Sequence, residues 1–581
     1  MKSVLGKNWK KQPINEEFAF NVTRSFQISD VLARLVARNV NSIDEAENFL
    51  YPKIKSLLPD PFHLKDMKQG VERVIQAINN KETICIFADY DVDGATSSAI
   101  LKNFFDDITV SSFIYVPDRI AEGYGPNAEA MQRIKNRGAS LIITVDCGSV
   151  AFEAIEHAVD IGLEVIVIDH HLSLDELPKA VALINPNRLD EDSDCKNLAA
   201  VGVSFLFLVA LLKSLKELNF FENKHAPNLM SYLDLVALGT VCDVMQITGL
   251  NRAFVMQGLK VAKQRGNIGY RALCDVASIE SAPDCYHLGF ILGPRINAGG
   301  RVGKSDLGAT LLSTKSPDIA TRIAKELDIY NEERKAIEFA MLEEASAIAE
   351  KQKDSAILFI AGEGWHPGVI GIVAGRLKEK YNKPTAIIAV NEGVGKASCR
   401  SVKGVDFGCK IIEAKQRGLL IAGGGHAMAA GFTVDESEME KLHEFLEEQC
   451  ARQLAVSDAH LTSYYDIDIT TSAASVGLVK EISALEPYGV GNPAPIFRFS
   501  GLYVLKADIV GLKHIKILFA PDRMSYGKKT LPAIIFNAVD TPISDVIFSK
   551  KPLKLDVFGK LKINSWQGNE TVQLILEDVC I

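Results

Sequence analysis

The sequence predicts an α/β protein that ends in an antiparallel β-barrel. Three observations predict this class. Apolar runs alternate with helical segments over residues 83–186, a long amphipathic helix follows at 323–348, and short runs of alternating apolar and polar residues fill the chain after residue 456. We therefore expect a parallel-sheet domain, a long connecting helix, a second α/β domain and a barrel, in that order along the chain.

The first α/β domain is expected at residues 66–320, after a segment of short helices at 1–65. Most of its apolar runs are rich in β-branched residues and show little alternation, as strands buried on both faces do. We infer a parallel sheet covered by helices on both faces, followed by a helical region at 195–260. The predicted strands are TICIFAD, TVSSFIYVPD, SLIITVDCG, LEVIVIDHH and AVALINP.

The connecting helix is predicted at 321–353, because apolar residues recur there at helical spacing with charged residues between them. A second α/β domain is predicted at 354–455, with strands SAILFIAG and PTAIIAV and a glycine cluster at 423–425. The glycines of GWHPGVIGIVAGR do not have the spacing of a dinucleotide-binding loop, so this run indicates packing of a helix on a strand.

The last segment, 456–581, alternates apolar with polar residues, which is typical of half-buried antiparallel strands. Several short strands of this kind predict a small barrel, and an OB-fold is the version we prefer. Basic residues outnumber acidic ones from Gly501 onward, against the trend of the chain. The predicted strands are YDIDIT, HIKILF, LKLDV, KLKIN and TVQLIL.

Composition limits the class of protein. The chain has 581 residues, 47% hydrophobic and 24% charged, which is typical of a globular protein with about three or four domains. Its net charge of −9 requires any contact with nucleic acid to come from local basic patches. Ten cysteines without a CxxC pair argue against a zinc site and indicate a reducing cytoplasm. The longest apolar run, Ala199–Leu212, is too short to span a bilayer, so we expect no membrane association.

Acidic residues and histidines follow three of the predicted parallel strands. FADYDVDG follows the first strand, TVDCGS contains the end of another, and VIDHH ends a third, while LGTVCDVM brings one more aspartate from the helical region. Because the carboxyl ends of parallel strands share one edge of the sheet, we expect these side chains to gather there. The residues are Asp89, Asp91, Asp93, Asp146, Asp169, His170, His171 and Asp243.

Such a concentration of carboxylates needs cations to offset it. Carboxylates with imidazole suit Mn²⁺ or Mg²⁺, and a pair of ions about 3.5–4 Å apart would bind a phosphate and activate water. An acid at one strand end is usually a helix cap or a turn residue. Four sets of residues at matching positions favour a two-ion site instead.

The order DYDVDG, TVDCGS, DHH and GTVCDV resembles the DHH phosphoesterase superfamily. GGGHAMAAGF resembles its DHH-associated domain, and with GPRINAGGR and the C-terminal barrel the chain resembles the bacterial RecJ type over almost its whole length. The resemblance implies a 66–320 catalytic domain and a 354–455 nucleic-acid-binding domain. The pattern departs at Phe87, where many relatives have histidine.

The resemblance also implies roles for the acidic residues. Asp89, Asp91 and Asp146 would bind one metal ion, and Asp146 would be shared with the other. Asp169 would orient its neighbours, and His171 would lie near the scissile phosphate. The ligands of the other ion would be Asp93, Asp146, His170 and Asp243.

Arginine beside glycine is a candidate for phosphate binding, because its fork matches phosphate oxygens and glycine permits close approach. The resemblance implies that Arg119, Ser398 and Arg400 receive the 5′ end and that Arg295 or Arg301 holds the nearby backbone. Gly424, Gly425 and His426 would contact nucleic acid, although GGGHAMAAG is also compatible with a tight turn before a packed helix.

The activity implied by the resemblance is 5′→3′ exonucleolytic hydrolysis of single-stranded DNA with Mn²⁺ or Mg²⁺, in DNA repair and recombination. Expected partners are single-stranded DNA, a single-strand-binding protein and a helicase. Two alternatives remain: a phosphodiesterase for short oligonucleotides or cyclic dinucleotides, and an inactive DNA-binding replication scaffold. The long C-terminal barrel argues against the first, and the intact acidic set argues against the second.

Overall fold

The computed structural model describes residues 2–118, 122–123, 125–456, 458–522, 530–549, 553–566 and 568–581. The chain forms two compact units. One unit contains Asn39–Glu333 and Leu485–Pro493, and the other contains Met1–Arg38, Arg334–Ala484 and Ala494–Ile581. The five segment boundaries expected from the sequence stay a prediction.

The first α/β domain has a parallel sheet in the order β3-β2-β4-β5-β6. Each neighbouring pair of strands is parallel, so the predicted parallel sheet is confirmed. The chain leaves β2 toward β3 on one side and then crosses to β4 on the other, which places a topological switch point between β2 and β4. The strands are β2 (Thr83–Ala88), β3 (Ser112–Tyr115), β4 (Ala139–Val145), β5 (Glu164–Ile168) and β6 (Ala182–Ile184).

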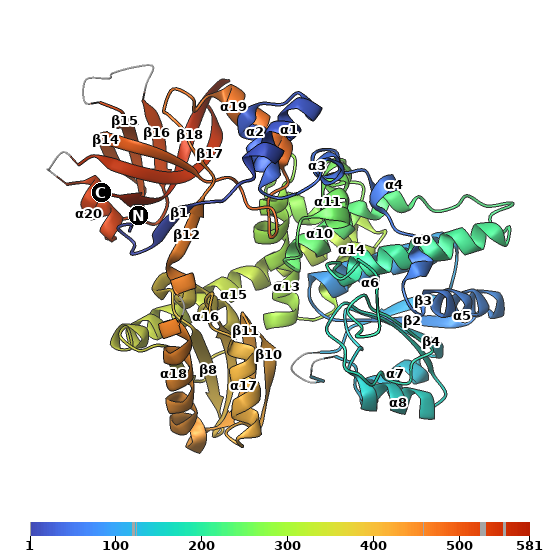
Figure 1. Ribbon diagram of the computed structural model, residues 1–581. Helices are drawn as coiled ribbons and strands as arrows, with labels where there is room; N and C mark the ends of the chain where they lie inside the picture. The colour runs from blue at the N-terminus through green and yellow to red at the C-terminus, as the bar shows by residue number, and fades with distance from the viewer. Residues whose placement is uncertain are drawn as a thin grey trace. The chain divides into compact units, whose positions relative to one another are not determined.

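Helices cover both faces of this sheet (Figure 1). Alternate residues of β2 enter different apolar clusters, with Ile86 packed in the larger cluster and Phe87 in the smaller one. Both side chains are fully buried, which explains the continuous apolar runs in the sequence. The larger cluster includes α6 (Val92–Asp107) and α9 (Ala200–Glu217), and the smaller includes α7 (Ala128–Asn136) and α8 (Phe152–Asp160).

The rest of this unit is helical, as expected for residues 195–260, and the helices continue beyond that range. A π-helical turn, His287–Leu292, leads directly into α13. The helices are α3 (Ile43–Leu50), α4 (Ile54–Leu57), α5 (Met67–Asn80), α10 (Leu233–Cys242), α11 (Gly249–Ala262), α12 (Ile268–Val276), α13 (Gly293–Val302) and α14 (Leu307–Ser313). The connecting helix α15 (Pro317–Lys351) extends past both ends of the periodic apolar pattern.

The second α/β domain has a sheet in the order β10-β11-β9-β8-β7. Only β7 and β8 were predicted from the sequence; they pair in parallel, and the remaining pairs are antiparallel. The strands are β7 (Leu358–Glu363), β8 (Thr385–Asn391), β9 (Val394–Arg400), β10 (Ala422–His426) and β11 (Ala429–Asp435). The helices are α16 (Ile370–Tyr381), α17 (Phe407–Gln416) and α18 (Met439–Val456).

The C-terminal strands form a barrel in the order β13-β14-β15-β16-β18-β17, closed by pairing of β14 with β17. LKLDV and KLKIN, predicted as two strands, form one strand with an irregularity between Phe558 and Gly559. The strands are β13 (Ile467–Asp468), β14 (Phe497–Val510), β15 (His514–Ala520), β16 (Leu531–Ile535), β17 (Leu555–Trp566) and β18 (Asn569–Cys580), with α19 (Val476–Ile482) and α20 (Pro542–Ile547).

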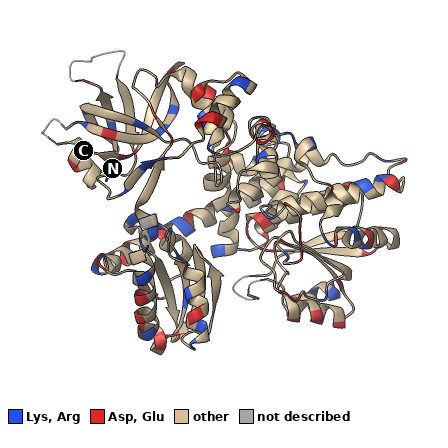
Figure 2. Cartoon of the chain, viewed as in Figure 1, with Lys and Arg blue, Asp and Glu red and all other residues tan. Residues whose placement is uncertain are grey.

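The N-terminal residues belong to the same unit as the barrel. Strand β1 (Asn8–Lys11) pairs in parallel with β12 (Thr462–Tyr465), and α1 (Glu16–Phe26) and α2 (Asp30–Ala37) follow it. In Figure 2 the charged residues lie mainly on helices and loops, and the central strands are mostly uncharged. Within the described part of the chain, no helix combines the length and apolar character needed to cross a membrane.

Candidate active site

The acidic residues lie where three neighbouring strands end. Asp89 follows β2, Asp146 follows β4, and Asp169 follows β5. Because β4 lies between β2 and β5, these strand ends are adjacent at the carboxyl edge of the sheet. Asp146 adopts a left-handed backbone conformation with φ of 60°, which aspartate tolerates better than most residues and which turns the chain out of β4.

The turn between β2 and α6 is held by its own aspartates. The backbone N–H groups of Asp93 and Gly94 donate to Oδ1 of Asp91 at 2.9 and 3.2 Å, so Asp91 caps α6. Asp93 in turn accepts hydrogen bonds from the backbone N–H groups of Ala200 at 2.6 Å and Val201 at 2.9 Å, at the start of α9. Each aspartate therefore has a fixed orientation that does not depend on a ligand.

His170 lies at the centre of the carboxylates. Its Nε2 is 3.3 Å from Asp146 Oδ1, 3.5 Å from Asp243 Oδ2 and 3.7 Å from Asp93 Oδ2. Nε2 is buried and has no hydrogen-bond partner among the described residues. A histidine nitrogen in this state presents its lone pair to a ligand when the other ring nitrogen carries the proton, as in metal-binding histidines.

The potential ligand atoms fall into overlapping groups. Within each group, one nitrogen or oxygen from every residue lies within 4.8 Å of the others. Asp146 and His170 each belong to more than one group, so these two residues join the clusters into one acidic centre. The groups are Asp89, Asp91 and Asp146; Asp93, His170 and Asp243; and Asp146, His170 and His171.

The protein alone does not balance the charge of the acidic centre. Burial, together with neighbouring carboxylates, raises the pKa of Asp93 and Asp146 well above the usual range for aspartate. Burial and the charge of Asp91 raise the pKa of Asp243 to about 7, and burial lowers the pKa of His170 to about 4. Buried carboxylates around an imidazole with an unpaired nitrogen fit Mn²⁺ or Mg²⁺.

Asp169 has a different environment from the other aspartates. Its Oδ1 accepts hydrogen bonds from the backbone N–H of His170 at 2.7 Å and pairs with His171 Nδ1 at 2.8 Å, and its Oδ2 accepts from the Ser149 N–H at 3.0 Å. Although burial opposes ionisation, these bonds lower the pKa of Asp169. The same pairing raises the pKa of His171 to about 9. Asp169 therefore orients a protonated His171 at the edge of the acidic centre.

Residues outside the predicted set support these side chains. Asn297 Oδ1 accepts a hydrogen bond from the Val92 N–H at 3.1 Å, and a side chain at Gly300 would clash with the ring of Tyr90. The motif GPRINAGGR, in which only the arginines were predicted to have a role, thus supports the turn that carries Asp89 and Asp91. The asparagine and glycines of the motif are the sequence feature from which this support could have been predicted.

The INPN segment after β6 holds the histidines in the same way. Asn185 Nδ2 donates to the carbonyl oxygen of His171 at 2.8 Å, and Asn187 Nδ2 donates to that of His170 at 2.6 Å. Phe87, at the position where a histidine was noted in relatives, is fully buried and stacks on Tyr115 with ring centroids 5.7 Å apart. It is part of the apolar core beneath the sheet edge.

Arg295 and Arg301 lie on α13, the helix that also carries Asn297 and Gly300. Arg295 donates from Nε to Asp328 at 2.9 Å and from a terminal nitrogen to the carbonyl oxygen of Ile291 at 2.8 Å, so its guanidinium is already partly engaged. Arg301 lies in the last turn of α13. Arg119, which the sequence predicts to bind a phosphate, lies outside the described residues.

Ser398 and Arg400 lie two residues apart on β9 and therefore on the same face of its sheet. Arg400 donates to Ser398 Oγ at 3.2 Å and to the Cys399 carbonyl oxygen at 2.8 Å, and burial lowers its pKa. A Cβ atom at Gly371, in the first turn of α16, would be 2.9 Å from Ser398 Oγ and 3.3 Å from an Arg400 nitrogen. Gly371 thus permits α16 to begin beside both side chains.

The start of α16 lies beside this Ser398–Arg400 site, and the N–H groups of Ile372 and Val373 there already donate to the Val369 carbonyl oxygen. The N-cap residue of α16, Val369, makes no side-chain hydrogen bond to the helix. Unsatisfied N–H groups and the positive end of the helix dipole favour an anion. The run GVIGIVAG was predicted to pack a helix on a strand, and Gly371 was not among the predicted site residues.

The glycine cluster forms the edge strand β10, which pairs with β11. The tight turn before a helix is therefore not observed, because a strand follows GGGHAM. Gly425 has a φ of 148°, and a Cβ atom there would clash with Ala430. No described atom lies within 4 Å of a Cβ atom at Gly424, and His426 is exposed, so this edge presents an open backbone surface.

Known families match most of the chain. The DHH family N-terminal domain matches residues 83–240, the DHHA1 domain matches 353–452, and the RecJ OB domain matches 465–578. The matched ranges contain the parallel sheet, the second α/β sheet and the barrel. The expected α/β architecture with a C-terminal OB-fold is confirmed.

Individual relatives match almost the whole of this chain. The single-stranded-DNA-specific exonuclease RecJ of Bacillus subtilis (strain 168) is 31% identical, over 99% of this chain and 71% of its own length. The Escherichia coli (strain K12) protein of the same name is 33% identical, over 95% of this chain and 96% of its own length. The crystal structure of RecJ in complex with Mn²⁺ from Thermus thermophilus is similar with a TM-score of 0.81 at 25% identity, covering 99% of this chain and 79% of that one. The chain belongs to the RecJ family of single-stranded-DNA-specific exonucleases.

Proposed function

We propose that this protein is a metal-dependent exonuclease that degrades single-stranded DNA in the 5′→3′ direction, in DNA repair and recombination. The observation that carries the proposal is the acidic centre, where buried carboxylates surround an unpaired imidazole nitrogen. The names of its relatives supply the substrate class, and two solved relatives contain Mn²⁺ or Mg²⁺.

Two sets of ligands would hold the cations, with Asp146 in both. When bound, divalent cations neutralise phosphate oxygens, make water a stronger nucleophile and stabilise the leaving oxygen. Charge balance supports this assignment, because the raised pKa values of Asp93 and Asp146 mean that ionised carboxylates repel one another there. The first set is Asp89, Asp91 and Asp146, and the second is Asp93, Asp146, His170 and Asp243.

His171 would act on the phosphate from the edge of this centre. Asp169 holds Nδ1 of His171, so Nε2 is the atom that remains to donate a hydrogen bond. With its pKa raised to about 9, the ring keeps its proton at neutral pH. A half-exposed imidazolium at this place would bind a phosphate oxygen and supply a proton to the departing strand.

The polarity of degradation would come from recognition of the 5′ end. A terminal phosphate carries more charge than an internal one, and the Ser398–Arg400 site offers a guanidinium, a hydroxyl and the start of a helix. We assign the terminal phosphate to Ser398 and Arg400, and the phosphate-binding role of Arg119, which lies outside the described residues, stays a prediction from the sequence. Gly424, Gly425 and His426 would contact the strand, and Arg295 or Arg301 would hold its backbone.

The barrel would bind single strands farther along the DNA, through positive charge and base stacking, as OB-folds do. All ten cysteines are unpaired, which supports a reducing cytoplasm as the site of action. A helicase and a single-strand-binding protein would be the partners that produce and coat the substrate.

A labelled-strand assay tests the proposal. One single strand carries a label at its 5′ end and the other at its 3′ end, each with Mn²⁺ or with EDTA. We expect the 5′ label to leave in the first product and the 3′-labelled strand to shorten progressively, with no cleavage in EDTA. Binding without cleavage would indicate a scaffold, and cleavage confined to dinucleotides would indicate a phosphodiesterase.

A further inference from the structure

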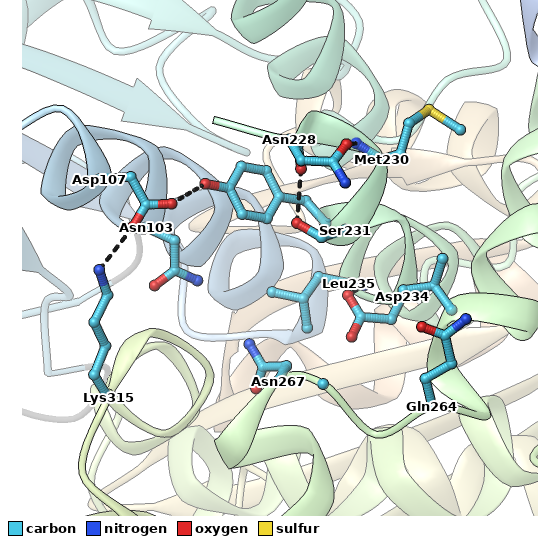
Figure 3. Close-up of a pocket in the computed structure, with 13 residues that line it drawn as sticks. Asn103, Asp107, Asn228, Met230, Ser231, Asp234, Leu235, Gln264, Asn267 and Lys315 are labelled. Carbon is cyan, nitrogen blue, oxygen red and sulfur yellow. Dashed lines mark hydrogen bonds and ion pairs between the residues drawn. The ribbon is translucent and has the colours of Figure 1, made fainter. Parts of the chain in front are cut away.

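A polar cavity lies in the same unit as the acidic centre. It has a volume of about 490 Å³ and is lined by the ends of several helices, including the C-terminal end of α6 and the start of α10 (Figure 3). Asn103 and Asp107 line it from α6, and Tyr232 and Asp234 line it from the α10 side. The lining of this cavity contains none of the residues of the acidic centre.

Asp234 is the feature that points to a ligand. The residue is 1% exposed, and within the described chain its Oδ2 is buried without a hydrogen-bond partner. Its Oδ1 accepts a hydrogen bond from the Leu235 N–H at 2.8 Å. In Figure 3 the carboxyl group points inward, toward Leu235 and Asn267. Burial raises the pKa of Asp234 to about 7, so the ionised form lacks a compensating charge.

The other acid in the cavity is already compensated. Asp107 pairs with Lys315 at 2.8 Å and accepts a hydrogen bond from the Tyr232 hydroxyl at 2.9 Å. Because this pair is neutral, the net charge of the lining is set by Asp234 and is negative when that carboxyl group is ionised. A phosphodiester would be repelled by that charge, which argues against a second DNA-binding site.

The acidic centre is at the other end of the same two helices. Asp91 and Asp93 begin α6, and Asp243 ends α10, whereas Asp107 and Asp234 lie at the opposite ends. α6 contains 16 residues, which corresponds to about 24 Å. A molecule in the cavity would not touch the acidic centre but would contact both helices that carry its aspartates.

We propose that this cavity binds a small organic ammonium ion of the polyamine class. Asp234 Oδ2 offers one charged acceptor, and the carboxamides of Asn103 and Gln264 line the same cavity as neutral polar groups. An ammonium group has several N–H donors that point in different directions, so it can hydrogen bond to the carboxylate and to a carboxamide oxygen at the same time. The apolar side chains of Leu235 and Val261 fit the methylene groups between ammonium groups.

The same geometry disfavours two other cations. A guanidinium fork prefers both oxygens of a carboxylate, but Asp234 Oδ1 is already used by the backbone. A bare metal ion would occupy little of a cavity this large, since even one water molecule accounts for about 30 Å³ in the liquid.

Calorimetric titration of the full chain with spermidine tests the proposal. The titration is done without DNA and with saturating Mn²⁺, so that the acidic centre does not compete for the amine. We expect one spermidine per chain, with at least a tenfold weaker affinity in Asp234→Asn. Asp160→Asn is the matched control, because it removes an exposed carboxylate in the same unit, and its affinity should equal that of the wild type.

Thermal unfolding distinguishes loss of binding from loss of fold. Asp234→Asn removes an uncompensated buried charge, so it should unfold at a temperature no lower than the wild type does, and spermidine should raise that temperature only in the wild type and in Asp160→Asn. Equal spermidine affinity in Asp234→Asn and wild type, or tighter binding of inorganic phosphate than of spermidine, would overturn the proposal.

Discussion

The acidic centre and the Ser398–Arg400 site carry charge of opposite sign: carboxylates in the first and a guanidinium in the second. In the acidic centre, burial and neighbouring carboxylates raise the pKa of Asp93 and Asp146, and His170 Nε2 has no hydrogen-bond partner among the described residues. In the Ser398–Arg400 site, the guanidinium of Arg400 is hydrogen bonded to the neutral oxygens of Ser398 and Cys399 beside an uncapped helix start. The acidic centre has the ligands for divalent cations, and we propose that an anion completes the Ser398–Arg400 site.

With two such sites, one chain would divide the recognition of a phosphorylated strand between them. Cations on the acidic centre would act on any phosphodiester, because they bind oxygens that every nucleotide carries. A preformed anion site would select the end of a strand, because a terminal phosphate has an additional charge. Chemistry and polarity would thus depend on different residues and should be separable by mutation.

The largest effect is expected from Asp146→Asn. Asp146 belongs to more than one ligand group, so its loss should lower the rate of cleavage by about 10³-fold or more on every strand. The control is Asp160→Asn, which lies away from the strand ends. In EDTA the Asp146→Asn variant should also be more stable than the wild type at pH 8, because it removes a repelling carboxylate. A wild-type cleavage rate would refute the shared-ligand assignment.

A smaller and more selective effect is expected from Arg400→Ala. Loss of a charged hydrogen bond is worth about 1.5–3 kcal/mol, or about 10–100-fold. The rate should fall by that factor on 5′-phosphorylated strands and much less on strands with a 5′ hydroxyl. Arg417→Ala, which removes an exposed arginine of the same domain, should leave both rates unchanged. Equal losses on both strands would mean that Arg400 binds the backbone in general.

The charge of the metal-free acidic centre should also appear in the pH dependence of stability. The pKa values of Asp243, about 7, and His171, about 9, are both raised by folding. Such groups stabilise the fold below their unfolded pKa, and this contribution is lost as the pH rises through the folded pKa. In EDTA the free energy of unfolding should therefore fall by about 1–2 kcal/mol between pH 6 and 8.5.

Saturating Mn²⁺ should remove most of that fall, because cations compensate the ionised carboxylates. Denaturant titrations at several pH values, with and without Mn²⁺, measure this fall in the free energy of unfolding. A fall of the same size with and without Mn²⁺ would show that the titrating groups lie elsewhere in the chain.

The smallest effect is expected from Gly371→Ala. The added Cβ atom would be 2.9 Å from Ser398 Oγ, so Ser398 and Arg400 must shift by a few tenths of an ångström. We expect the preference for a 5′ phosphate to fall by about threefold. Gly375→Ala in the same helix is the matched control, since nothing lies within 4 Å of its Cβ position. An equal change in both variants would assign the effect to helix stability.

The sequence predicted the acidic centre because its geometry follows from a simple rule. Asp89, Asp146 and Asp169 end buried parallel strands, and the ends of such strands share one edge. The supporting residues Asn297 and Asn185 were not predicted, because their hydrogen bonds depend on how distant segments pack. Ser398 and Arg400 were identified by resemblance alone, since two polar residues on a strand are otherwise common.

Strands were missed where local preference and tertiary structure disagree. β10, with the sequence AGGGH, has little intrinsic strand preference and is held by pairing with β11. The burial of Asp234 could not be predicted from the sequence for the same reason. This residue lies in the first turn of α10, where acids are common at exposed positions, and its burial comes from neighbouring helix ends.

The most direct test of this account is the number of Mn²⁺ ions that the metal-free chain binds, measured by calorimetry. The shared position of Asp146 predicts two ions in the wild type, one in Asp243→Asn, and weakened binding at both places in Asp146→Asn. Asp160→Asn should bind as the wild type does. Binding of two ions with unchanged affinity by Asp146→Asn would contradict the account, because Asp146 would then belong to neither site.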